Sequence, residues 1–360
     1  MLVVFAQVTD PRKRRGRRHR LPVLLTLATC AGLAGARSFT AIAEWAADAG
    51  ETVWSALGIV RVPDASTFRR VFTLLDADAL DTALGAWVAA ATSPGTRTRR
   101  RVAVDGKTLR GSRTGEVTGR HLLAALDHDT GVVLGQVAVD AKTNEIPALP
   151  VLLAGLDLTG VIVTADALHT QTETARWLIS RGAHYVLTVK ANQPSLYAQL
   201  AALPWGQVRT TARTVERGHG RRERRTAKAT EVRAGLLFPH AVQAVQITRR
   251  RQPFTDGPTE TEVAYLVTSV ATHQASPTQL AAIIREHWHV ENRLHWVRDV
   301  TFGEDLSQVR TGNAPQVMAS LRNLAIAVLR LTGVTNIAAG IRHHARRPER
   351  PLETIMKFVC

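Results

Sequence analysis

Cysteine is scarce in this chain, and its apolar segments are short. Only Cys30 and Cys360 occur among the 360 residues, too few for a disulfide framework or a cysteine-based zinc site. This usage is typical of a reducing compartment, so we expect a cytoplasmic location. The apolar run at 21–36 is sixteen residues long, whereas a membrane-spanning helix needs about 18. We therefore expect a buried helix there and no membrane partner, rather than a signal peptide or a membrane span.

Acidic residues are outnumbered by basic ones. The chain has 30 Asp and Glu against 46 Lys and Arg, which gives a formal net charge of +16. A charge excess of this size predicts a polyanionic partner, most simply nucleic acid. The hydrophobic content of 45% excludes a disordered chain, and the length predicts two or three domains.

The pattern along the chain changes several times. Residues 1–95 have apolar residues at helical spacing and predict an all-helical amino-terminal domain. The segment 92–98 has the composition of a linker, and strands then alternate with helices in 96–193, which predicts an α/β fold with a mixed sheet. Segment 194–278 predicts a β-rich basic insertion, 279–335 predicts long helices that complete the α/β core, and 336–360 predicts an extended basic tail.

Two clusters of basic residues are candidates for phosphate contacts. In the amino-terminal domain, Arg69 and Arg70 lie in a pair of short predicted helices, which fits either a helix-turn-helix-like DNA contact or an ordinary bundle with exposed arginines. In the insertion, Arg213–Lys228 holds seven positive and two negative residues, and Arg249–Arg251 adds three arginines. We expect these residues in loops that either track phosphates or are simply solvated.

Three carboxylates stand out in the α/β region. Asp105 and Asp166 each follow a predicted strand, at the sheet edge where ligands bind in open α/β folds. Glu291 lies on the helix after the insertion. Phosphodiester cleavage is often assisted by two metal ions about 3.5–4 Å apart, and Mg²⁺ prefers oxygen ligands. Each residue also has a structural explanation: Asp105-Gly106 as a turn, Asp166 as a helix cap, and Glu291 as an ion-pair partner of His295 or Arg298.

The sequence around these carboxylates resembles bacterial insertion-sequence transposases with an Asp-Asp-Glu triad, in the H-repeat-associated branch. The matching segments occur in the family's order over most of the chain, from about residue 8 to 335. They are Val104–Ser112, Asp166–Gln171, Tyr185–Gln193, His287–Trp296 and Asp299–Asp305, with Pro63–Phe72 resembling the family's amino-terminal associated domain.

The resemblance implies a ribonuclease-H-like catalytic core and metal-dependent DNA cleavage and strand transfer at transposon ends. Asp105, Asp166 and Glu291 would then be the catalytic, metal-binding triad, with two Mg²⁺ or Mn²⁺ ions. Partners would be double-stranded DNA, namely terminal inverted repeats and target DNA, and a dimer or higher assembly, with no small-molecule substrate and a nucleoid-associated location. The residues expected to contact DNA are Lys107, Arg110, Lys190, Asn192, Gln193, Arg298, Arg221, Arg222, Arg224, Arg225, Arg69 and Arg70.

Around the glutamate, the sequence departs from related transposases. The broader class places Tyr, Arg and Lys at positions where this chain has Ile284, His287 and Arg298. Arg298 can still contact a phosphate, as a guanidinium fork rather than a point charge. Two alternatives stay open: a catalytically inactive, transposase-derived DNA-binding protein, and a zinc hydrolase using His287, Glu291 and His295, which are spaced along one helical face.

Overall fold

The structure is a computed structural model, and it describes residues 1–15, 17–92, 99–115, 117–139, 145–218, 220–232, 236–255 and 257–358. Most of the expected linker, residues 93–98, lies outside these ranges. The chain divides into two compact units: the first comprises 1–93, 106–156 and 290–360, and the second 94–105 and 157–289. Each unit joins segments far apart in the chain, so the domain boundaries read from the sequence stay predictions.

The strands form a mixed sheet in the order β3-β2-β1-β4-β5-β9-β8-β7-β6. Strand β1 (Arg101–Thr108) belongs to both units, because the division falls between Asp105 and Gly106. In the second unit β1 pairs in parallel with β4 (Ile162–Ala165), and β4 in parallel with β5 (His184–Val189). In the first unit β2 (His121–Asp127) and β3 (Val133–Val139) are antiparallel. This order and the flanking helices confirm the predicted α/β, ribonuclease-H-like fold class.

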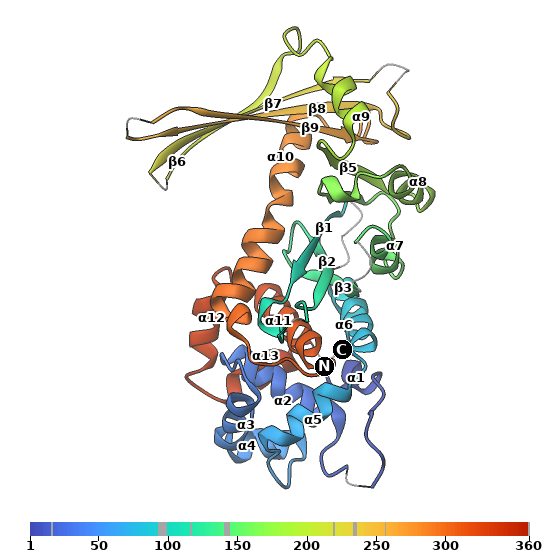
Figure 1. Ribbon diagram of the computed structural model, residues 1–360. Coiled ribbons are helices and arrows are strands. Elements are labelled where there is room, and N and C mark those ends of the chain that lie inside the picture. The colour runs from blue at the N-terminus through green and yellow to red at the C-terminus, as the bar shows by residue number, and fades with distance from the viewer. Residues whose placement is uncertain are drawn as a thin grey trace. The chain divides into compact units, whose positions relative to one another are not determined.

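Helices dominate the first unit, as the spacing of apolar residues in 1–95 predicts. Side-chain caps begin four of them: Ser38 accepts a hydrogen bond from Ala41 N, Asp64 from Thr67 N, Asp76 from Ala79 N, and Asn336 from Ala339 N. The amino-terminal and carboxyl-terminal helices cluster together within this unit (Figure 1). Its helices are α1 (Leu2–Ala6), α2 (Leu21–Leu33), α3 (Phe39–Asp48), α4 (Gly50–Leu57), α5 (Ala65–Leu74), α6 (Ala77–Ala91), α7 (Ala148–Leu153), α11 (Ala314–Leu331), α12 (Ile337–His344) and α13 (Glu349–Met356).

The apolar run at 21–36 becomes the buried helix α2. Leu24, Leu25 and Leu27 are completely inaccessible to solvent, and α11, α1 and α13 of the same unit pack against α2. A helix that is apolar on every side is stable only when neighbours surround it, as they do here. Among the described residues, none of the helices combines the length and the apolar character that crossing a membrane requires.

The second unit contains β4 to β9 and the part of β1 up to Asp105. Its core lies between the sheet and α10 (Pro277–His287), where Val245, Leu266 and Ile283 are buried together. Helix α10 begins at a capping box formed by Ser276 and Gln279. The remaining elements are α8 (Thr172–Ser180), α9 (Pro194–Ala201), β6 (Thr210–Gly218), β7 (Arg221–Glu231), β8 (Gln243–Pro253) and β9 (Glu260–Thr268).

Several local expectations differ from the structure. The basic segments of the insertion are strands rather than loops, because β7 pairs along its length with β8 and carries its arginines within the sheet. The tail is not extended: α12 and α13 end the chain, and α13 buries Leu352 and Ile355. The single long helix expected from Gln279 ends at His287 and continues as π-helical turns at Val290–His295 and Val297–Thr301.

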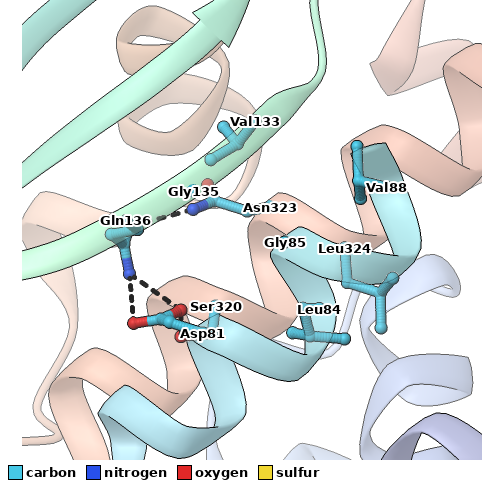
Figure 2. Close-up of a pocket in the computed structure, with 10 residues that line it drawn as sticks. All are labelled: Asp81, Leu84, Gly85, Val88, Val133, Gly135, Gln136, Ser320, Asn323 and Leu324. Atoms are coloured by element: carbon cyan, nitrogen blue, oxygen red, sulfur yellow. Dashed lines mark hydrogen bonds between the residues drawn. The ribbon is translucent and has the colours of Figure 1, made fainter. Parts of the chain in front are cut away.

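A buried polar cluster joins three elements of the first unit. Asp81 of α6 accepts hydrogen bonds from Gln316 and Ser320 of α11 and from Gln136 of β3, at 2.9, 2.6 and 3.2 Å. Figure 2 shows this carboxylate beside a small cavity next to β3. Burial raises the pKa of Asp81 to about 7, although the three hydrogen bonds oppose the rise, and the nearby Asp78 carboxylate adds to it.

This cluster predicts a pH-dependent stability. Because the folded pKa is raised above the unfolded value of about 4, the folded protein retains a proton between those values, and its stability falls as pH rises from about 4 to about 7. From about pH 5 to 7, this group alone should lower the free energy of unfolding by about 2 kcal/mol, at 1.36 kcal/mol per unit. Urea unfolding of Asp81→Asn should show a pH dependence weaker by that amount. Asp48→Asn, exposed at the end of α3 in the same unit, should keep the wild-type dependence; equal profiles for wild type and Asp81→Asn would contradict the assignment.

Candidate active site

Asp105 and Asp166 lie at the same edge of the sheet in the second unit. The parallel register pairs Val104 of β1 with Ala165 of β4, and each aspartate directly follows one of these residues. Neighbouring strands are about 4.8 Å apart, so the two aspartates lie side by side. Both are half-buried. The sequence predicts this placement correctly, because parallel strands present their carboxyl ends at one edge.

The sequence predicts that β1 ends before Asp105, but the strand does not end there. It continues to Thr108, because beyond Asp105 it is held on its other side, where Leu109 N donates to Arg120 O. Asp105-Gly106 is therefore not a turn. A Cβ on Gly106 would overlap the carboxylate of Glu145, which lies 2.7 Å from His121 Nε2. Glycine here permits a close approach to the strand.

A short 3₁₀ turn at Ala167–His169 fixes the Asp166 loop. One carboxylate oxygen of Asp166 accepts a hydrogen bond from Leu168 N at 3.0 Å, so Asp166 is also a cap. Asn192 Nδ2 donates to Ala167 O at 2.7 Å, and Gln193 Nε2 donates to Thr170 O at 3.0 Å. These two amides, expected to contact DNA, hold the loop that carries Asp166.

His287 ends α10 beside this loop. Its Nδ1 lies 2.8 Å from the hydroxyl of Thr164, two residues before Asp166. Burial lowers the pKa of His287 to about 4, although the negative charge of Asp166 acts in the opposite direction. His287 is therefore neutral at physiological pH.

Glu291 and His295 lie one turn apart in the first unit. The distance between Glu291 Oε2 and His295 Nδ1 is 3.2 Å. His295 is buried, while the Glu291 side chain is 58% exposed. The hydrogen bond from His295 lowers the pKa of Glu291, and the charges of His295 and Lys107 add to this against the effect of burial. The glutamate is thus an anion that faces outward and is oriented by its neighbour.

The first unit contains a pair of possible metal ligands. Glu291 and His295 bring a carboxylate and an imidazole within 3.2 Å of each other. This pair is part of a donor set that could hold a divalent cation.

Arg298 is a correction to the predicted DNA contacts. It is 1% exposed, its Nε donates to Glu304 at 2.9 Å, and its Nη2 lies 2.8 Å from the same carboxylate. Arg322 donates to the same carboxylate at 2.9 Å. A guanidinium held in this way cannot reach a phosphate, so Arg298 anchors the segment after Glu291. Local sequence does not indicate this cluster, since Arg322 lies 18 residues after Glu304.

The other predicted contact residues differ in accessibility. Lys107 is largely buried and forms an ion pair with Asp299 at 2.6 Å. Arg110 is 77% exposed, and Lys190, Arg69 and Arg70 are exposed. Arg69 and Arg70 lie on α5, in the first unit. Their contacts with DNA stay predictions.

Comparison with known proteins identifies the family. The model for the family described as "Transposase DDE domain" matches residues 96–328, more than half of the chain. The chain belongs to the DDE transposase family. A second model, described as "DDE_Tnp_1-associated", matches residues 2–88 of the transposase, the helical amino-terminal segment.

Individual relatives agree with this family. "Putative transposase YncI" of Escherichia coli O157:H7 is 28% identical over 96% of this chain and 91% of its own length. "H repeat-associated putative transposase YhhI" of Escherichia coli strain K12 is 28% identical over 91% of this chain and 89% of its own. A solved piggyBac transposase synaptic complex with hairpin DNA aligns with a TM-score of 0.46 and 10% identity, covering 99% of this chain and 77% of that one. The predicted family and the predicted function, an insertion-sequence transposase, are confirmed, and the family supports DNA as the partner.

Proposed function

We propose that this transposase cleaves and joins DNA strands at the ends of its element, with Asp105, Asp166 and Glu291 as the catalytic triad. The observation that carries the proposal is the position of the aspartates: the register of β1 and β4 places both at one sheet edge. Glu291 joins the triad in this proposal because the segment around it, His287–Trp296, resembles the family's glutamate motif.

Each residue has a distinct task in this proposal. Asp105, Asp166 and Glu291 would hold divalent metal ions, and His295 would orient the Glu291 carboxylate through its 3.2 Å contact. Oxygen donors suit Mg²⁺, and a neighbouring imidazole also suits Mn²⁺. Bound ions would stabilise the charge that develops on the phosphate oxygens. Water and then the freed 3′-hydroxyl attack phosphorus, so no protein nucleophile is needed.

The family's task extends the proposal to partners. Two transposon ends must be brought together, so we propose a dimer or higher assembly on DNA carrying terminal inverted repeats. Target DNA would be captured by the same assembly. The chain would act in the cytoplasm, at the nucleoid, where its substrate lies.

Metal removal tests the proposed reaction. The full-length protein, incubated with labelled DNA from both flanks of its gene, should cleave at inverted repeats when Mg²⁺ or Mn²⁺ is present. Treatment with EDTA should abolish cleavage, and added Mg²⁺ should restore it, because the proposed reaction depends on cations held by the carboxylates.

Two outcomes would favour the alternatives. Specific binding to the repeats without cleavage at any divalent cation concentration would indicate an inactive DNA-binding protein. One equivalent of zinc retained through purification, with cleavage independent of Mg²⁺, would indicate a zinc hydrolase.

A further inference from the structure

The ribbon formed by β6 to β9 carries arginine on both of its faces. Side chains alternate along a strand, so Arg221, Glu223 and Arg225 of β7 point to one face, and Arg222 and Arg224 point to the other. Residues paired across antiparallel strands share a face. The register therefore assigns the paired residues of the ribbon to one of two faces. The sequence alone does not separate the arginines of β7 in this way.

The first face, called here the Glu223 face, is neutralised from within. Glu223 is 8% exposed and accepts hydrogen bonds from Arg225 at 2.6 Å and Arg249 at 2.8 Å. Arg221 and Arg251 approach it to 3.9 and 3.7 Å. Burial would raise the pKa of Glu223, but the arginines outweigh this and lower it. The carboxylate is thus ionised, and its four neighbours already have a counter-charge.

Helix α10 packs on the same side of the ribbon. Arg285 of α10 forms an ion pair with Glu216 of β6, and the Arg249 guanidinium lies 6.0 Å from the ring centre of Trp288. Glu216 is paired with Glu223 across β6 and β7, so it belongs to the Glu223 face. Figure 1 shows α10 on one side of the strands and α9 on the other. The Glu223 face is therefore occupied by the protein's own elements.

The opposite face, called here the arginine face, consists of Arg213, Arg217, Arg222, Arg224 and Arg250. Among the strand residues that share it, none is acidic, and within the described ranges none of the five arginines forms an ion pair. Four are exposed and Arg224 is half-buried. Arg217 lies directly opposite Arg222, and Arg224 opposite Arg250. Like charges in such positions destabilise a sheet, unless an anion lies over them.

We propose that the arginine face binds the phosphate backbone of duplex DNA and that the Glu223 face does not. This rests on the proposed function, which supplies duplex DNA as the polyanion. Arginines two residues apart on one strand are about 6.7 Å apart, and those on neighbouring strands about 5 Å, which gives a two-dimensional array of guanidinium groups. Such an array makes phosphate contacts without reading bases, so the face contributes affinity and register rather than sequence choice.

Adjacent residues of one strand provide the test. Binding of a labelled random-sequence DNA duplex is measured by fluorescence anisotropy across a KCl series, in EDTA so that no cleavage occurs. Each phosphate contact contributes about 0.9 to the slope of log affinity against log salt. Arg222→Gln/Arg224→Gln should reduce the slope by about 1.8, whereas Arg221→Gln/Arg225→Gln should leave it within about 0.3 of wild type.

The single variants Arg222→Gln and Arg221→Gln repeat the comparison without disturbing the 2.6 Å bond of Arg225, and thermal melts confirm that each variant folds. Equal losses from both faces, or no loss from the arginine face, would overturn the proposal. Unchanged duplex binding combined with weaker binding to polyglutamate would assign the face to an acidic protein instead. Cleavage that survives Asp105→Asn would refute the proposed function and leave the binding result standing.

Discussion

Asp105→Asn should reduce DNA cleavage by at least about 10³-fold while duplex binding stays unchanged. The amide keeps the size of the side chain but lacks the charge to hold a divalent cation, and metal stabilisation of a phosphoryl transition state is worth several kcal/mol. At 1.36 kcal/mol per tenfold in rate, about 4 kcal/mol gives that factor. Asp166→Asn should have the same effect, because both aspartates lie at the same sheet edge. Cleavage is measured on end-labelled DNA carrying the inverted repeats.

Asp157→Asn is the matched control, since Asp157 is an exposed aspartate of the same unit whose only described role is a hydrogen bond to Thr159 N. It should cleave at the wild-type rate. Loss of duplex binding together with cleavage in Asp105→Asn would point to misfolding, which circular dichroism would detect. Undiminished cleavage by a folded Asp105→Asn would remove this residue from the triad.

Glu304→Gln should lower the free energy of unfolding by about 3–5 kcal/mol. The carboxylate is 2% exposed and neutralises both Arg298 and Arg322, which are 1% and 6% exposed. The amide would leave two guanidinium groups buried without a counter-charge, and breaking one side of a buried ion pair is far more costly than removing the whole pair. Urea or thermal unfolding measures the loss.

The control is Glu173→Gln, because Glu173 forms an exposed pair with Arg176 one turn along α8. Surface pairs of this kind contribute less than about 0.5 kcal/mol. A loss from Glu304→Gln no larger than the control's would show that the cluster is hydrated. Arg298 lies seven residues after Glu291 and anchors the segment that follows it. Because Glu304→Gln would loosen this anchor, a folded variant should also bind Mn²⁺ less tightly than wild type.

Elements with strong local signals are predictable from the sequence. Ser38, Asp64 and Asp76 are residue types that favour helix N-termini, and each begins a helix, while the apolar run at 21–36 is buried. The strand Ile162–Ala165 lies where its β-branched residues indicate. In each of these segments, the residues that specify the structure are close together in the chain, so tertiary contacts only reinforce the local preference.

The basic strands of the insertion were mistaken for loops for a physical reason. A strand with one buried face shows apolar and polar residues in alternation, but β7 has charged residues on both faces from Arg221 to Arg225. Its strand structure depends on pairing with β6 and β8, which local sequence does not report. The helical tail was missed likewise, because only Leu352 and Ile355 mark its buried side.

The candidate site was predicted only in part for a similar reason. Asp105 and Asp166 directly follow Val104 and Ala165, which the parallel register pairs, so the sheet brings the two aspartates together whatever the other residues are. The approach of Glu145 to Gly106 and the pairing of Arg298 with Glu304 depend on side chains meeting across the folded unit. An arginine that is buried looks the same in the sequence as one that is exposed on the surface.

The alternating register of β7 also limits how its sequence can change in length. Gain or loss of one residue within β7 before Glu223 would turn every following side chain of β7 to the opposite face. Glu223 would then lie among the arginines that face outward, and Arg222 and Arg224 would lie against the side that carries α10. The composition, and hence the net charge of the ribbon, would be almost unaltered. Among relatives, insertions or deletions in β7 before Glu223 are therefore compatible with two distinct faces only when they add or remove an even number of residues.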